Sequence, residues 1–480
     1  MPKYFSGLDN NFSAINTKEM TTAIVAPIQD SGLVVAAGTY DGVLAGWEFQ
    51  APSKNQKDLD DDIHTKKQLS LTFATAVHEG SIRSLTIAGS IKENEPGQLL
   101  SCGYDESLKT HDWHKRMTSS GEIRTPSDFG TPVCSAFAPP NSHSTHCLVG
   151  FSHGKLCIYK KRDWSVQHVL AGHEGGVGAL AVHPSGKLAL SGGVVDGKLK
   201  LWDLTKGRLA FVNKIDPAST RGGKAKYDPV SSLVWSKDGE FYAMSHGPRI
   251  TVREVASGKT LLDADMLSQV NQVTLMVGPE GLFVAAACND GSLPVLAVED
   301  TDEESRRAIM AIEPVDSHLA REERFKCIQC VRDYIVVTAN SAGVVSLMDL
   351  RGAVNMIMSG DEKPQGGEGD SDNEDSDNDE DLELAVDMIE SVQLGTGARI
   401  TCLSAWCKTT ECQLETVSEE IPSFTTEQQQ KTDSQEKKRK QETVGDISLD
   451  AVALKKARSL VEKAKKLKKK REKNKKKLSN

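Results

Sequence analysis

Residues 171–211 read AGHEGGVGALAVHPSGKLALSGGVVDGKLKLWDLTKGRLAF. Short apolar or alternating runs predict three strands, at 177–182, 187–191 and 198–203. Asp196-Gly197 is typical of the tight turn of a β-hairpin and separates the second strand from the third. The stretch therefore predicts one small antiparallel unit that begins with Gly-His and ends with Trp-Asp.

Four polar or aromatic residues of this unit are spaced so that they can meet. Asp196 lies six residues before Trp202, and a hairpin can fold that turn back toward His173 and Ser191. Buried polar groups must be paired, and once paired they fix one geometry. We interpret these residues as structural and not catalytic. A unit of this kind is one blade of a WD-repeat β-propeller.

The same spacing recurs along the chain. Asp41 precedes Trp47 by six residues, and His78 and Asp105 repeat the blade pattern with His111 in the place of Trp. The third strands fall near residues 47, 111, 159, 202, 253, 296 and 348, which are 43 to 64 residues apart. This spacing fits a repeat of roughly 40–45 residues with loop insertions, and it predicts seven blades.

The fold class that follows is all-β, with a seven-bladed propeller over residues 21–410. Residues 1–20 are polar and are expected to form an N-terminal extension. Residues 359–383 are too polar to pack, which predicts a disordered acidic insert. Residues 411–480 are expected to form a Lys-rich tail that is disordered to partly helical.

Two segments compete for the innermost strand of the first blade. One is 400–406, near the end of the propeller, and the other is 22–28, near its start. We favour the C-terminal segment, because a propeller closed by its last strand leaves no free sheet edge.

Charge is segregated along the sequence. Residues 455–477 hold 14 Lys or Arg and 2 Glu, a net charge of +12, whereas the whole chain carries −9. The rest of the chain therefore carries −21, and residues 368–383 contribute ten acidic residues and no base. A basic tail on an acidic body indicates nuclear import and contact with RNA.

The tail residues that we assign to nuclear localisation and RNA contact are Lys437, Lys438, Arg439, Lys440, Lys455, Lys456, Lys465, Lys466, Lys468, Lys469, Lys470 and Arg471. The acidic insert is either a solvated spacer or a regulated segment. Ser371 and Ser376 each have acidic residues at +1 and +3, which makes them candidate phosphorylation sites for an acidophilic kinase.

Other chemistry is disfavoured. Residues 150–154 match a Gly-x-Ser-x-Gly hydrolase turn, but a strand follows them where that turn requires a helix. Cys327 and Cys330 have metal-like spacing, but alternate strand positions place them on opposite faces. No cofactor, metal or membrane partner is expected, because no 18-residue apolar run and no Gly-rich phosphate loop occur. Scattered cysteines suit a reducing compartment.

Three stretches carry a family resemblance. Residues 183–191 with 207–211, the closing segment 398–406 and the first blade at 33–49 resemble the p21-activated-kinase-interacting WD-repeat proteins. The chain departs from that pattern in its first 30 residues, its acidic insert and the sequence of its tail. The resemblance implies a nucleolar assembly factor for the large ribosomal subunit, and animal members are also described as binding and restraining p21-activated kinase.

We therefore expect a non-enzymatic scaffold in ribosome biogenesis, located in the nucleus and nucleolus. The propeller would bind ribosome-assembly and ribosomal proteins, and the tail would contact pre-ribosomal RNA. The chain would act as a monomer within a larger complex. The alternative is a signalling scaffold that binds and restrains a p21-activated kinase.

Overall fold

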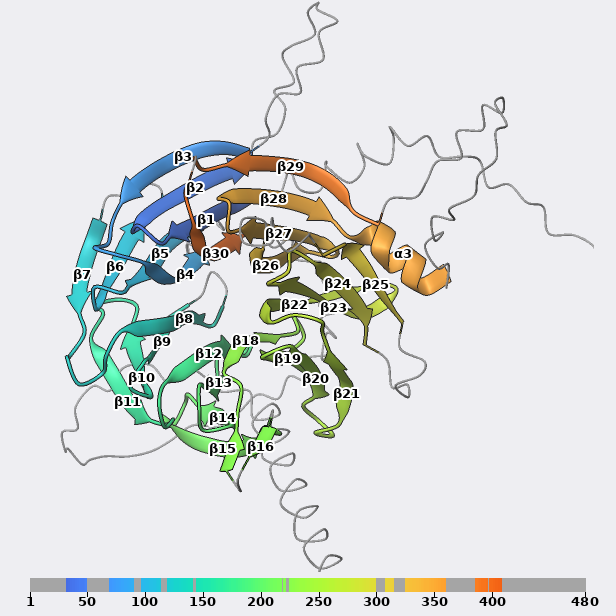
Figure 1. The fold of residues 1–480 in the computed structure, drawn as a ribbon. Coiled ribbons are helices and arrows are strands. Elements are labelled where there is room, and N and C mark those ends of the chain that lie inside the picture. Colours follow the sequence, from blue (N-terminus) through green and yellow to red (C-terminus); the bar gives the residue numbers. More distant parts are fainter. Residues whose placement is uncertain are drawn as a thin grey trace, which may run out of the picture. The chain divides into compact units, whose positions relative to one another are not determined.

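The computed structural model describes residues 32–49, 69–89, 96–113, 119–140, 144–217, 219–221, 224–298, 307–314, 324–359, 385–395 and 397–407. Within these ranges, seven antiparallel sheets of four strands stand side by side in a ring, and each sheet is one blade (Figure 1). The chain therefore forms the seven-bladed β-propeller that its repeats predict.

The blades follow the chain, apart from the first. From the innermost strand outward, blade one contains β30 (Ile400–Trp406), β1 (Val34–Thr39), β2 (Val43–Phe49) and β3 (Leu69–Ala76). Blade two contains β4 (Ile82–Gly89), β5 (Pro96–Gly103), β6 (Ser107–Asp112) and β7 (Ser119–Arg124). Blade three contains β8 (Pro132–Ala138), β9 (His146–Phe151), β10 (Lys155–Lys160) and β11 (Val166–Ala171).

The remaining blades are consecutive in sequence. Blade four contains β12 (Val177–Val182), β13 (Leu188–Gly193), β14 (Lys198–Asp203) and β15 (Arg208–Lys214). Blade five contains β18 (Val230–Trp235), β19 (Phe241–His246), β20 (Arg249–Glu254) and β21 (Thr260–Asp265). Blade six contains β22 (Val270–Gly278), β23 (Gly281–Cys288), β24 (Leu293–Ala297) and β25 (Ala308–Ile312). Blade seven contains β26 (Phe325–Arg332), β27 (Ile335–Asn340), β28 (Val344–Asp349) and β29 (Asp387–Gln393).

The ring is closed by its last strand. β30 pairs antiparallel with β1, with Ala405 opposite Val35 and Leu403 opposite Ala37 (Figure 1). The sequence-based preference for residues 400–406 as the closing strand is therefore confirmed. The competing segment, residues 22–28, lies outside the described residues.

Polar side chains join neighbouring innermost strands. The Gln329 side chain of β26 accepts a hydrogen bond from the Ala405 backbone N–H at 2.8 Å and donates one to the Ala405 carbonyl at 2.9 Å. The hydroxyls of Ser84 on β4 and Ser135 on β8 lie 2.8 Å apart. These contacts replace backbone pairing that strands of different blades do not make, so they help to hold the ring together.

Apolar side chains fill the interfaces between blades. Each of the seven apolar clusters combines residues of two adjacent blades. Trp47 lies between blades seven and one, Trp202 between three and four, and Trp235 between four and five. The core of the propeller is therefore shared between blades, and each blade depends on its neighbours for burial.

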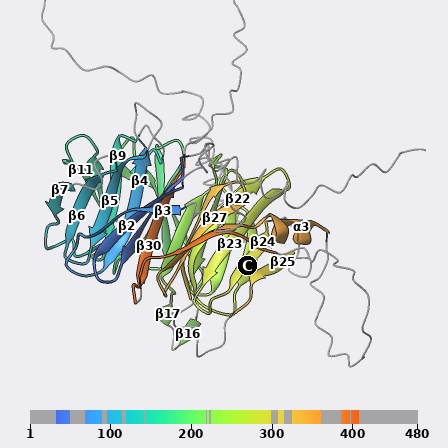
Figure 2. The ribbon, with the colours of Figure 1, turned by 90° about the horizontal axis from the view of Figure 1, so that it is seen from above.

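One face of the ring gathers two kinds of connection, and we call it the loop face. It carries the loops that enter each innermost strand and the turns that join the second and third strands of a blade. Hydrogen bonds link the two kinds, such as Tyr104 N–H to the Ser81 carbonyl and Val270 N–H to the Gly247 carbonyl. A hairpin of β16 (Ser219–Arg221) and β17 (Lys224–Lys226) interrupts the connection from blade four to blade five and projects beyond the ring in Figure 2.

One element differs from the sequence-based expectation. Helix α3 (Arg351–Ser359) follows β28, so Ser359 ends a helix and does not begin the acidic insert. Asp349 accepts a hydrogen bond from the Arg351 backbone N–H at 2.9 Å, and Ala353, Val354 and Ile357 pack into the core between blades six and seven. Residues 360–384 lie outside the described part of the chain, as do the extension at 1–20 and the tail at 411–480.

Candidate functional site

The four residues singled out in blade four meet in one chain of hydrogen bonds. Trp202 Nε1 donates to Ser191 Oγ at 2.8 Å, and Ser191 Oγ lies 2.7 Å from His173 Nε2. His173 Nδ1 lies 3.0 Å from Asp196 Oδ2. Asp196 also accepts a hydrogen bond from the Lys198 backbone N–H at 3.1 Å, which closes its own turn. The network ties a loop, two strands and a turn of the blade together.

The charge state of His173 follows from its surroundings. Burial lowers the pKa of His173 even though the adjacent Asp196 opposes the shift. The ring is therefore neutral near pH 7, with a proton on Nδ1 for Asp196 and a lone pair on Nε2 for the Ser191 hydroxyl. Ser191 in turn accepts from Trp202, so every polar group in the network is paired.

The order Ser191–His173–Asp196 has the connectivity of a hydrolase triad, and burial decides against that role. Ser191 has no exposed surface, and neither does the side chain of His173. A serine nucleophile must reach a substrate carbonyl beside an oxyanion hole. Here the indole of Trp202, itself only 3% exposed, occupies the space next to the hydroxyl. The geometry supports a structural network.

Blade two builds a variant of this network. Ser101 Oγ lies 2.7 Å from His78 Nε2 and 3.0 Å from His111 Nε2, so an imidazole takes the place of the indole. His78 Nδ1 lies 3.0 Å from Asp105. Within the described residues, His111 Nδ1 is buried without a hydrogen-bond partner. Blade two is therefore less completely paired than blade four.

The buried histidines predict a loss of stability in acid. Burial lowers the pKa of His78 and His173, and it lowers that of His111 to about 4. Below about pH 6.5 the unfolded chain binds protons that the folded chain does not. The histidine contribution to the free energy of unfolding should therefore be complete near pH 7.5 and fall from about pH 6.5 toward pH 4, by at most about 1.4 kcal/mol per pH unit for each histidine.

Urea unfolding between pH 7.5 and 5 measures this slope. The matched variant is His111→Gln, which keeps an amide donor for Ser101 and removes one titrating group. Its stability should depend less steeply on pH than that of the wild type. Parallel curves for the two proteins would show that His111 takes up its proton equally well in the folded state.

The pair expected in blade one is not joined. Trp47 is buried, but Asp41 is exposed, and within the described residues no hydrogen bond connects them. The reason is the closure of the ring. The innermost strand of blade one is β30, and the loop before it, residues 394–399, contains no histidine to bridge the turn and the strand.

Two further turn residues were not recognised in the sequence as parts of the pattern. Asp290 accepts from the Ser292 backbone N–H at 3.1 Å, as Asp196 does from Lys198. Asn340 accepts from Ala342 N–H at 3.1 Å in the corresponding turn of blade seven. These two turns have the same spacing as the turn at Asp196, but the histidine that lies four residues before the first strand of blade four has no counterpart in their blades to mark them in the sequence.

The remaining candidates divide into two groups. The basic residues from Lys437 to Arg471 and the serines Ser371 and Ser376 lie outside the described residues. Cys327 and Cys330 do occupy opposite faces of β26, one packed toward blade one and the other toward blade six. Burial raises the pKa of both thiols, to about 12 for Cys330.

The described ranges contain neither a candidate metal site nor a candidate membrane span. No group of three or more metal-ligating side chains gathers there. No helix in the same ranges is long and apolar enough to cross a membrane. The turn at 150–154 joins two strands, β9 and β10, and Ser152 Oγ accepts a hydrogen bond from the Thr131 backbone N–H at 3.0 Å.

A model of the WD domain, G-beta repeat, matches residues 164–203, which hold the whole network of blade four. The chain is a seven-bladed β-propeller with a WD repeat in its fourth blade. This WD-repeat propeller is similar to "p21-activated protein kinase-interacting protein 1-like" of Xenopus laevis, with 23% identity over 378 residues, covering 78% of this chain and 83% of the relative. It is 28% identical over 324 residues to "Shk1 kinase-binding protein 15" of Schizosaccharomyces pombe, covering 65% and 76%.

A shorter match connects the WD-repeat propeller to "Telomerase Cajal body protein 1" of Rattus norvegicus, with 32% identity over 126 residues. It covers 25% of this chain and 23% of that relative. The longer matches confirm the resemblance to p21-activated-kinase-interacting proteins that the sequence indicated.

Proposed function

We propose that this WD-repeat propeller is a non-enzymatic scaffold for maturation of the large ribosomal subunit in the nucleolus. The propeller binds ribosome-assembly and ribosomal proteins, and the basic tail attaches the scaffold to pre-ribosomal RNA. The observation that carries the proposal is the charge segregation. A net charge of +12 in residues 455–477 attracts nucleic acid, whereas the rest of the chain, at −21, does not.

The structure of the propeller supports the scaffold part. The ring is closed, the polar network of blade four is buried and paired, and the loops lie at the surface on a rigid frame. Loops held by a rigid frame commonly bind partners.

A second candidate is a scaffold that binds a p21-activated kinase and restrains it. It is favoured by the printed names of two relatives, one a p21-activated protein kinase-interacting protein and the other a Shk1 kinase-binding protein. The two candidates predict different locations, nucleolar for the first and cytosolic for the second.

Localisation and sedimentation test the proposal together. A fluorescent fusion of the full chain should concentrate in nucleoli and sediment with precursors of the large subunit. A full-length control with the Lys and Arg residues of 455–477 replaced by Gln should lose both. A diffuse cytosolic protein that stays out of these precursors, but is retained by purified p21-activated kinase, would favour the second candidate.

The acidic insert yields a separate prediction. Deletion of residues 361–383, which leaves α3 and β29 intact, should not change the melting temperature. The segment is almost entirely Asp, Glu, Asn, Ser and Gly, so it has too few apolar side chains to offset the entropy of ordering. Thermal melting of the deletion variant checks this, and a lower melting temperature would show that the segment belongs to the fold.

Phosphorylation of the same segment is testable in cells. Ser371 and Ser376 should carry phosphate, each adding a charge of about −1.5 to −2. Mass spectrometry of the isolated protein should find both peptides modified. Peptides that are consistently unmodified would leave the insert as a spacer.

A further inference from the structure

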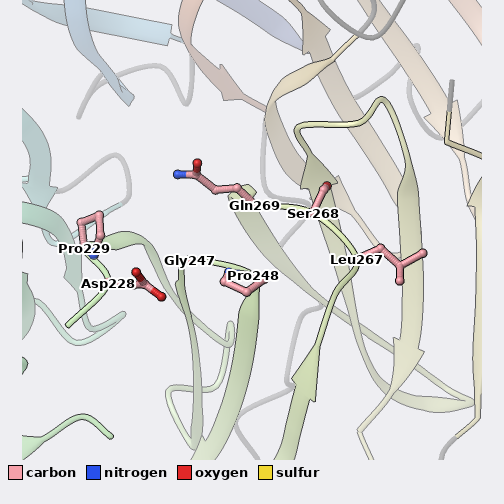
Figure 3. Close-up of a pocket in the computed structure, with 7 residues that line it drawn as sticks. All are labelled: Asp228, Pro229, Gly247, Pro248, Leu267, Ser268 and Gln269. Carbon is pink, nitrogen blue, oxygen red and sulfur yellow. The ribbon is translucent and has the colours of Figure 1, made fainter. Parts of the chain in front are cut away.

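The loop face contains an open pocket between blades five and six (Figure 3). Its volume is about 450 Å³. Three segments line it: Asp228 and Pro229 before β18, Gly247 and Pro248 between β19 and β20, and residues 267–269 before β22. Segments from separate places in the chain therefore converge on one concavity.

Gly247 is one of the residues that line this pocket. Its φ is +60°, and a Cβ at this position would lie 2.5 Å from Asp228 Oδ2. The glycine thus allows the carboxylate to approach the turn closely. Pro229 and Pro248 have no backbone N–H, so neither residue supplies a donor to neutralise the carboxylate. Within the described residues, Asp228 makes no hydrogen bond or ion pair.

Two basic side chains of blade five near this pocket, Arg249 and His246, do not pair with Asp228. Arg249 donates to both carboxylate oxygens of Asp265, at 2.9 and 3.1 Å, and its Nε lies 3.7 Å from Asp263. His246 is buried, and burial lowers its pKa, so the ring is neutral. Neither Arg249 nor His246 therefore neutralises the carboxylate of Asp228.

Apolar and amide groups border this charge. Leu267 is 90% exposed, the highest exposure among the large apolar side chains of the described residues. Gln269 is exposed, and within the same residues its side chain makes no hydrogen bond. The loop face also exposes Tyr40 and Tyr104, each 60% accessible. Leu267 therefore places an exposed apolar side chain beside the carboxylate of Asp228, a pairing that complements a partner segment carrying both a cation and an apolar side chain.

We propose that this pocket docks an extended, basic segment of a partner protein. A Lys or Arg side chain of that segment pairs with Asp228, a neighbouring apolar side chain packs on Leu267, and its backbone accepts a hydrogen bond from the Gln269 amide. The inference rests on the proposed scaffold function and adds the chemical class of the partner. A partner protein is favoured over RNA because Asp228 repels phosphates and the neighbouring cluster of Arg249 with Asp263 and Asp265 carries a net negative charge.

Binding of a short fluorescein-labelled peptide with alternating Arg and Leu to the full-length protein tests this assignment. Asp228→Asn should weaken binding about tenfold, and Leu267→Ser should weaken it about fivefold. The matched controls are Glu240→Gln, on the opposite face of blade five, and Val166→Ser, on β11 away from the pocket. Both controls should bind like the wild type, and thermal melting should be the same for all four variants.

Several results would overturn the assignment. The first is equal peptide binding by the wild type and Asp228→Asn. The second is RNA binding at the pocket, seen when single-stranded RNA displaces the peptide and itself binds in a way that depends on Asp228. The third is self-association of the protein that is lost in the Leu267→Ser variant. Peptide binding seen only after Lys465, Lys466 and Lys468–Lys470 are replaced by Gln would mean that the chain's own tail occupies the pocket. If the peptide does not bind but the tail still binds RNA, the pocket assignment is wrong and the proposed function stands. A full-length protein that stays out of nucleoli but binds the peptide through Asp228 would overturn the proposed function and leave the pocket assignment standing.

Discussion

Replacing Trp202 with Ala should destabilise the propeller by about 3–5 kcal/mol. The indole is 3% exposed and fills the interface between blades three and four, so its removal leaves a cavity that two rigid sheets cannot close. The same change removes the Nε1 donor to Ser191, although that hydroxyl keeps its contact with His173. Urea unfolding at pH 7.5 measures the loss.

Two variants separate the parts of this effect. Trp202→Phe retains most of the packing and removes the donor, so it should cost clearly less than Trp202→Ala. Phe211→Ala, on the neighbouring strand β15, truncates a side chain that is 44% exposed and should cost under about 1 kcal/mol. Equal losses in Trp202→Ala and Phe211→Ala would contradict the assignment of Trp202 as a residue of the blade core.

RNA affinity of the full chain should fall steeply with salt. Residues 455–477 carry +12 and include no aromatic side chain that could stack on a base. Binding is therefore expected to be electrostatic and nearly blind to sequence. If about half of the cations neutralise phosphates of a single strand, the slope of log affinity against log salt is about −4 to −5. Fluorescence anisotropy with unrelated RNAs of equal length measures it.

The control for this prediction is removal of residues 437–480. The shortened protein should lose the slope and most of its RNA affinity, because the remaining acidic body repels phosphates. Circular dichroism should show that the propeller stays folded. A shortened protein that still binds RNA with the same salt slope would falsify this division of labour, since the contacts would then lie on the propeller.

Much of the fold could be predicted because each blade has a sequence pattern within one short stretch of the chain. The offset from Asp196 to Trp202, and the histidine before the first strand, report a hairpin whose polar groups must meet inside one blade. The prediction that Asp41 joins such a network was wrong, because the innermost strand of blade one comes from the other end of the chain. A local pattern cannot report which residues a distant segment will bring.

Features that depend on neighbouring blades were harder to predict from the sequence. Six of the seven residues of β15 are exposed, so this outer strand shows no buried alternation to distinguish it from a loop. Helix α3 is short, and its apolar residues are buried only in the core between blades six and seven. The pocket at Asp228 is made by three loops, each of which looks unremarkable in sequence.

The pairing of β30 with β1 also sets an order in time. Thr401 of β30 donates to the carbonyl of Gly38, 363 positions earlier in the chain. At a synthesis rate of about 5–20 residues per second, β1 leaves the ribosome roughly 20 to 70 s before its partner exists. Throughout that interval the inner edge of blade one presents unpaired N–H and C=O groups to the cell. The first blade to be translated is thus the last to be finished, and truncation of the chain between residues 393 and 400 leaves an open ring in which every other blade is complete.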